Sequence, residues 1–157
     1  KEYHQLYGIP VSVIRPFSVY GAGLRKQLFW DICQKIYHSA NKSITLYGTG
    51  NESRDFIYID DLSALIEILF KSATFQNDVY NAASGIETCI FEIAAQIEKC
   101  LPQAQINFSG EIREGDPINW CANIGKITDL GFKPGINLIA GIEKYIYWFK
   151  TLHPNGN

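Results

Sequence analysis

The chain has 157 residues, of which 46% are hydrophobic and 19% are charged, and its formal net charge at pH 7 is −2. This length and balance are typical of one ordinary soluble globular domain with a substantial core. The small negative charge argues against a general nucleic-acid-binding or membrane-surface role, and no apolar run is long enough to span a bilayer.

The first residues predict the end of a helix. Residues 1–7 read as helical, and Gly8 and Pro10 then form a stop signal. The chain contains no methionine, so we expect that Lys1 is not a native translation start and that upstream sequence is missing. The opening residues also lack the apolar core of a signal peptide.

Strand and helix patterns alternate through the first half of the chain. The predicted elements are a strand over 11–14 that ends at Arg15-Pro16, a flexible and exposed loop to Gly23, a helix over about 26–39, a brief strand over 44–47 and a buried strand over 56–59. Asp60 or Asp61 is expected to cap the next helix. The buried stripe of that helix is predicted to be Leu62, Leu65, Ile66 and Leu69.

The second half continues the alternation less regularly. The predicted elements are a strand over 79–82, a helix capped by Thr88, a short strand over 106–108, a small helix over about 125–130, a last helix capped by Asn137 and a polar tail from His153. The last helix is expected to align Leu138, Ile142, Tyr145, Ile146 and Phe149. This order indicates an α/β fold with parallel pairing in at least part of the sheet.

The most informative motif runs from Gly48 to Asp61, GTGNESRDFIYIDD. A glycine turn leads to Arg54, which opens the apolar run of the buried strand. A guanidinium group offers planar, bidentate hydrogen bonds to phosphate or carboxylate, so Arg54 is a candidate anion ligand. The alternative is a surface ion pair between Arg54 and Asp55, and the residues alone leave both interpretations open.

The sequence offers no catalytic or metal-binding set. The Gly-X-Gly turns lack the third glycine of a dinucleotide-binding loop, and no tyrosine has a lysine four residues later. No spacing indicates an activated nucleophile. The cysteines are too far apart for a metal site or a disulfide framework, and we expect reduced cytosolic thiols at Cys33, Cys89, Cys100 and Cys121.

Two further segments are candidate binding features. Arg113 and Asp116 lie in one loop and offer a cation for an anion and a carboxylate for sugar hydroxyls, although a solvated charged turn has the same pattern. Tyr47 follows Thr45 on a short strand, where its ring could stack on a base or belong half-buried to the core. Trp30 and Trp120 are interpreted as packing residues.

Five motifs in this order resemble the C-terminal half of the extended short-chain dehydrogenase/reductase family, the NAD-dependent nucleotide-sugar epimerases and dehydratases. They are YGIPVSVIRPFSVYGAG, ITLYGTG, RDFIYIDDL, YNAASG and REGD. The resemblance implies the C-terminal portion of a Rossmann-like epimerase fold, with a few parallel strands and a small, less regular substrate-binding α/β region. The NAD-binding half, with its glycine fingerprint and its Tyr-xxx-Lys pair, is expected to precede Lys1.

The resemblance also implies the roles of individual residues. Those near the nicotinamide are Pro16, Phe17 and Val19. Those that contact the nucleotide sugar are Ser18, Gln27, Leu28, Thr45, Tyr47, Arg54, Arg113 and Asp116. Within this set, Arg54 and Arg113 match a pair of arginines that clamps the diphosphate, Asp116 matches a carboxylate on the ribose, and the strand with Tyr47 matches one that packs the nucleobase. Ser18 replaces a usual asparagine.

The leading hypothesis is therefore the substrate-binding part of an NAD(P)-dependent nucleotide-sugar epimerase or dehydratase. The full-length enzyme is expected to oxidise the sugar transiently by hydride transfer to NAD, to be cytoplasmic and to form a homodimer. Residues 1–157 alone are expected to be inactive. The alternative hypothesis is a non-catalytic nucleotide-sugar-binding or regulatory module.

Overall fold

The computed structural model describes residues 2–112, 115 and 118–154. The first half contains α1 (Glu2–Tyr7), β1 (Val11–Pro16), β2 (Ser18–Tyr20), α2 (Gln27–His38), β3 (Ser43–Leu46), β4 (Ser53–Tyr58) and α3 (Ile59–Ser72). The second half contains β5 (Gln76–Ala82), β6 (Glu87–Cys89), α4 (Ile90–Cys100), β7 (Gln105–Phe108), α5 (Gly125–Asp129) and α6 (Leu138–Leu152). The alternation of strands and helices confirms the predicted α/β class.

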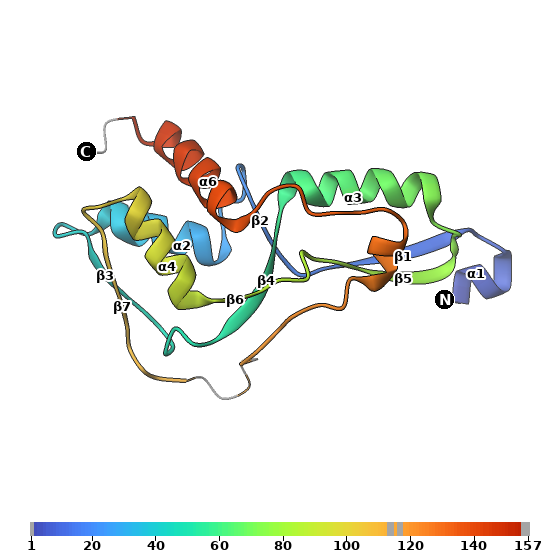
Figure 1. The fold of residues 1–157 in the computed structure, drawn as a ribbon, viewed down its shortest axis with the longest axis horizontal. Coiled ribbons are helices and arrows are strands. Elements are labelled where there is room, and N and C mark those ends of the chain that lie inside the picture. The colour runs from blue at the N-terminus through green and yellow to red at the C-terminus, as the bar shows by residue number, and fades with distance from the viewer. Residues whose placement is uncertain (1, 113–114, 116–117, 155–157) are drawn as a thin grey trace.

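The strands form small sheets in which parallel pairing dominates. β1 pairs in parallel with β5, β3 with β7, and β2 with β4. β4 also pairs antiparallel with β6 through its first three residues. Figure 1 shows an elongated molecule in which β4 runs between two groups of elements: α3, α5, β1 and β5 at one end, and α2, α4, α6, β3 and β7 at the other.

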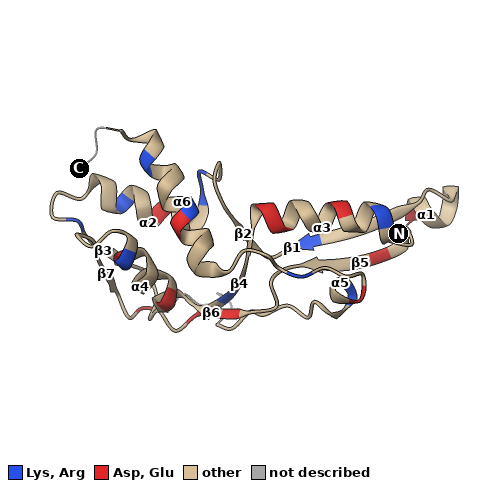
Figure 2. Cartoon of the chain, turned by 45° about the horizontal axis from the view of Figure 1, so that its top comes forward, with Lys and Arg blue, Asp and Glu red and all other residues tan. Residues whose placement is uncertain are grey.

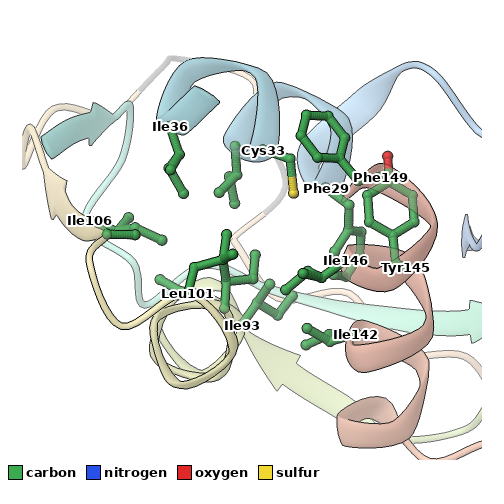
Figure 3. Close-up of a cluster of buried hydrophobic side chains, with 14 of the residues drawn as sticks. Phe29, Cys33, Ile36, Ile93, Leu101, Ile106, Ile142, Tyr145, Ile146 and Phe149 are labelled. Atoms are coloured by element: carbon green, nitrogen blue, oxygen red, sulfur yellow. The ribbon is translucent and has the colours of Figure 1, made fainter. Parts of the chain in front are cut away.

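The larger core lies between α2, α4 and α6 (Figure 3). The helical spacing of apolar residues creates it, because α6 buries Ile142, Tyr145, Ile146 and Phe149 on one face. Asn137 caps this helix by accepting a hydrogen bond from the Ala140 N–H at 2.9 Å, as predicted. The smaller core contains Ile57, Leu65, Leu69, Tyr80, Ala82, Ile127 and Phe132.

β4 belongs to both cores. Successive side chains of a strand point to opposite faces, so Tyr58 packs in the larger core and Ile57 in the smaller one. The strand that carries the GTGNESRDFIYIDD motif is thus the structural link between the two ends of the molecule.

Several predicted boundaries are wrong. β1 extends through Pro16, and the segment expected to be an exposed loop contains β2, whose Tyr20 is 2% exposed. Tyr20 is buried because it stacks on Phe29. β4 begins at Ser53, before the apolar run, because its first residues pair with β6.

The predicted helix caps for α3 and α4 are also wrong. Neither aspartate caps α3: Asp61 accepts hydrogen bonds from the N–H groups of Gly135 and Ile136 at 2.9 and 3.0 Å instead. Ile66 is 47% exposed and therefore does not belong to the buried stripe of α3. Thr88 lies in β6, and α4 begins after Cys89, whose N–H donates to Glu92.

Two aromatic predictions also need correction. Trp120 is 49% exposed, although its ring meets Phe17 edge-on. His153 is no polar tail residue, because its ring stacks on Tyr37. The cysteines are free thiols, and within the described part of the chain no helix could cross a membrane.

Candidate functional site

A cavity of about 500 Å³ lies beside β4, at the amino end of β2 and the carboxyl end of β3, and against α2. Its walls come from segments that are far apart in the sequence. The lining includes Phe17, Ser18, Val19, Leu24, Gln27, Leu28, Phe29, Asp31, Lys35, Leu46, Tyr47, Gly48, Glu52, Arg54, Phe56, Ile90, Glu111, Ile112 and Ile118. We call this space the first cavity.

The first cavity gathers most of the residues that the sequence singles out. Ser18, Gln27, Leu28, Tyr47 and Arg54 all line it. So do Phe17 and Val19, which the resemblance places near the nicotinamide. Residues separated by more than thirty positions therefore meet in one hollow, which the linear sequence does not reveal by itself.

Other expected site residues lie elsewhere. Thr45 is exposed on β3 and is not part of the lining. Pro16 lines a second cavity of about 430 Å³, which shares Phe17 and Ser18 with the first. Arg113 and Asp116 lie outside the described residues, while Glu111, Ile112 and Ile118, on either side of them in the sequence, line the first cavity.

Arg54 lies within β4, opposite Thr88 of β6, and is half-buried. One of its guanidinium nitrogens, Nη1, donates to the carbonyl oxygen of Ser53 at 2.7 Å. The alternative of a surface ion pair with Asp55 is wrong, because Asp55 is 1% exposed and accepts hydrogen bonds from backbone N–H groups. Arg54 thus brings a cation to the cavity wall.

The glycine turn is organised by Glu52. Its carboxylate accepts hydrogen bonds from the Thr49 N–H, the Thr49 hydroxyl and the Gly50 N–H at 3.0, 3.0 and 2.9 Å. Gly48 and Gly50 have φ values of 109° and 85°, which other residues rarely adopt. Burial by itself would raise the pKa of the Glu52 carboxyl, but the hydrogen bonds from Thr49 and Gly50 outweigh it and lower that pKa.

α2 supplies cavity residues that the sequence analysis missed. Asp31 and Lys35 both line the cavity and form an ion pair at 2.7 Å. Gln27, at the start of the helix, has a φ of 67°. The signal for the pair was the i,i+4 spacing of opposite charges, but only the fold shows that this face of the helix meets the cavity.

Tyr47 follows β3 directly and is 46% exposed. Tyr47 lines the cavity and is not among the residues that form or pack against the two cores, so the interpretation as a core tyrosine is wrong. An accessible aromatic ring at a cavity wall can stack on a planar ligand group.

Charges of both signs surround the cavity. Asp31, Glu52 and Glu111 supply the carboxylates, and Lys35 and Arg54 the cations. Figure 2 shows basic and acidic positions interspersed along the helices and strands. Such a site can hold an anion only at particular cations, and not through a general positive potential.

The family model described as "NAD dependent epimerase/dehydratase family" matches residues 1–83, which is more than half of the chain. The chain belongs to this family. The family is NAD-dependent by its description, which agrees with the cofactor that the sequence resemblance implies.

Similar proteins support the family assignment. A putative UDP-glucose 4-epimerase of Methanocaldococcus jannaschii is 31% identical over 96% of this chain and 49% of its own length. A UDP-glucuronate 4-epimerase of Thermodesulfobacterium geofontis is 30% identical over 94% of this chain and 46% of its own length. The chain spans about half the length of the curated relatives it matches.

Solved structures confirm the Rossmann-like epimerase fold, matched over its C-terminal half. The UDP-glucuronic acid 4-epimerase of Bacillus cereus, solved with UDP-glucuronic acid and NAD, superimposes with a TM-score of 0.84 at 27% identity and covers 96% of this chain and 48% of its own. An epimerase of Methanothermobacter thermautotrophicus gives a TM-score of 0.87 at 19% identity, over 98% of this chain and 47% of its own, which bears on the fold alone.

Proposed function

We propose that this chain forms the nucleotide-sugar-binding part of an NAD(P)-dependent epimerase or dehydratase and that the first cavity receives the nucleoside diphosphate. The observation that carries the proposal is the convergence of Ser18, Gln27, Leu28, Tyr47 and Arg54 on that one cavity. Its volume of about 500 Å³ is in the range of small-molecule sites.

The chemistry of the lining supports a ligand with a planar group and a doubly charged group. Arg54 offers a forked cation to phosphate oxygens, and Tyr47 offers an exposed ring to a base. Leu28 and Phe56 provide apolar surface in the same lining. We propose that Arg113 and Asp116 complete the site as the second phosphate cation and the ribose carboxylate.

The residues expected near the nicotinamide also fit the proposed cofactor side. Pro16, Phe17 and Val19 lie at and just beyond the carboxyl end of β1, which pairs in parallel with β5, and ligands of open α/β sheets bind at carboxyl ends. NAD, when bound in the whole protein, supplies a hydride acceptor. We propose that Phe17, which lines both cavities, separates the cofactor side from the nucleotide side.

We propose that the whole protein oxidises and re-reduces its sugar and that residues 1–157 alone do not turn it over. No tyrosine of the chain has a lysine four residues later, so the phenol–ammonium pair expected for proton removal has no counterpart in it. The same observation favours a second candidate, a binding or regulatory module without catalysis. Turnover of a UDP-sugar by residues 1–157 with added NAD would contradict both.

Titration calorimetry with UDP, uridine and inorganic phosphate tests the binding proposal on the intact protein. UDP should bind, and uridine should bind more weakly, because the Arg54 contact requires phosphate. Arg54→Ala should weaken UDP binding by roughly tenfold to a hundredfold, since a hydrogen-bonded charged contact contributes about 1.5–3 kcal/mol.

Arg25→Ala is the matched control, because Arg25 is exposed on the loop before α2 and does not line the cavity. It removes the same charge and should leave UDP binding almost unchanged. Equal affinity for UDP and uridine, or equal losses in the two variants, would show that the cavity is not a diphosphate site.

A further inference from the structure

Asp55 is a deeply buried carboxylate that the proposed ligand contacts do not use. It is 1% exposed, compared with 7% for Asp61. Its Oδ1 accepts from the N–H and the hydroxyl of Ser84 at 2.8 and 2.7 Å. Its Oδ2 accepts from the N–H groups of Gly85 and Ala122 at 2.9 and 3.2 Å. A buried carboxylate requires such compensation, so these contacts are strong constraints on the segments that supply them.

The donors belong to segments that are remote in sequence. Ser84 and Gly85 form the turn between β5 and β6. Ala122 lies in the stretch without regular structure that precedes α5, and we call residues 118–122 of that stretch the wall segment. The wall segment is bound to β4 at a further point, because the Ser53 N–H donates to the carbonyl oxygen of Ile118 at 2.8 Å. Asp55 thus joins the wall segment, the β5–β6 turn and β4 at a single side chain.

The wall segment takes part in both cavities. Ile118 lines the first cavity, and Trp120, Cys121 and Ala122 line the second. Its position relative to β4 therefore sets the boundary of each cavity. The cavities also meet at Phe17, whose ring is in edge contact with Trp120 at a centroid distance of 5.8 Å.

The hydrogen bonds from the β5–β6 turn and the wall segment to Asp55, which we call the lock, are related to Arg54 by strand geometry. Alternate side chains of β4 point to opposite faces: Arg54 and Phe56 line the first cavity, while Asp55 between them lines the second. On one face, β4 therefore presents Arg54, the proposed contact to phosphate. On the other face, Asp55 holds the wall segment. A shift of the wall segment changes the distance between Ile118 and Arg54.

We propose that Asp55 is a positioning residue, which holds the wall segment against β4 and keeps the first cavity preorganised for its ligand. The inference rests on the proposed nucleotide site for its effect on binding, but the lock itself can be tested separately. It acts through Arg54 and the wall segment, without touching the ligand.

Asp55→Asn is the informative substitution. The amide keeps the size of the carboxylate but has one accepting oxygen and an NH₂ group, which must face backbone N–H donors. At least one donor then loses its partner, and a half-satisfied buried network is destabilising. We expect the wall segment to detach more often from β4 while the rest of the molecule remains folded.

Asp61→Asn is the matched control. Asp61 is also buried and also accepts from backbone N–H groups, those of Gly135 and Ile136, but it lines neither cavity. Both variants lose a buried carboxylate, so a general loss of stability should be similar in the two. Only the Asp55 variant should change the wall segment.

The measurements are hydrogen exchange of the wall segment by mass spectrometry and UDP affinity by calorimetry, both on the intact protein at a temperature where circular dichroism shows wild type and variants folded. Asp55→Asn should speed amide exchange at residues 118–122 and weaken UDP binding about tenfold, which corresponds to about 1.4 kcal/mol. Asp61→Asn should do neither.

The outcomes separate this inference from the proposed function. Unchanged exchange of the wall segment in Asp55→Asn, or equal changes in Asp61→Asn, would overturn the positioning role. So would faster exchange with UDP affinity unchanged, because the lock would then not organise the site. Selective exchange in Asp55→Asn, in a protein whose wild type binds no UDP, would sustain the lock on the wall segment and overturn the nucleotide assignment together with the effect on binding.

Discussion

At the level of single residues, Glu52 ties the stability of the glycine turn to pH. Its lowered pKa means that the folded state favours the carboxylate, so its contribution is present above the unfolded pKa and is lost as the pH falls through the folded value. Glu52→Gln should therefore lower the urea-unfolding free energy at pH 7, and the difference from wild type should shrink as the pH falls below about 4.5.

Glu143→Gln, on the exposed face of α6, is the control for this pH series. It removes an equal charge without touching the turn. A difference between wild type and Glu52→Gln that stays constant between pH 7 and pH 3 would contradict the role of the charged carboxylate.

The left-handed backbone conformation of Gln27 is expected to lower the stability of the protein. Its φ of 67° costs a non-glycine residue about 1 kcal/mol or more, and its side chain lines the first cavity. Gln27→Gly should raise the unfolding free energy by about 1 kcal/mol and weaken UDP binding, as measured by urea denaturation and calorimetry.

Lys42, with a φ of 56° before β3 and outside the first cavity, is the comparison residue. Lys42→Gly should bind UDP like the wild type and should gain less stability, because it also loses the hydrogen bond from the Lys42 ammonium to the Tyr37 carbonyl oxygen. If Gln27→Gly binds UDP normally, Gln27 does not contact the ligand.

At the level of elements, the close approach of α6 to β2 depends on Gly141. A Cβ atom at this position would lie 2.0 Å from the hydroxyl oxygen of Tyr20, and Tyr20 is fixed by its stack on Phe29. Gly141→Ala should therefore lower the unfolding free energy by about 1–3 kcal/mol through overpacking, although alanine is the better helix former.

The double variant Gly141→Ala, Tyr20→Phe tests the cause of that loss. Removal of the hydroxyl should restore part of the stability, as measured by thermal denaturation of the single and double variants. Independent effects of the two substitutions would show that the contact with the Tyr20 hydroxyl is not the reason.

Elements with strong periodicity were predictable from the sequence. The face of α6 with Ile142, Tyr145 and Ile146 follows directly from spacing, because helical packing repeats every 3.6 residues. The caps of α3 and α4 were not predictable in this way. In α3, the buried Asp61 accepts hydrogen bonds from Gly135 and Ile136, which are far along the chain. Local rules consider only neighbours in sequence.

The same contrast holds for the candidate site. Arg54 could be selected from its motif, and Tyr47 from its place after a short strand. Asp55 looked like the partner of Arg54 because the two are adjacent, whereas strand alternation sends them to opposite faces. The cavity residues Asp31 and Lys35 depend on how α2 packs, which no local pattern specifies.

At the level of the whole molecule, β4 should make the two cores unfold together. Its residues Ile57 and Tyr58 belong to different cores, so loss of one core removes the support of the other. Leu65→Ala, in the smaller core with an exposed fraction of 0%, should lower the unfolding free energy by about 2–5 kcal/mol. Trp30 and Trp148 pack against the larger core, and in a Trp120→Phe background, which removes the third tryptophan, they report on that core by fluorescence. Their unfolding midpoint in urea should fall as far as the midpoint from circular dichroism.

Ile66→Ala, one position along α3 at a 47% exposed residue, is the control and should shift neither midpoint by much. A fluorescence midpoint that stays at the wild-type value in Leu65→Ala would show that the cores unfold independently and that β4 does not couple them.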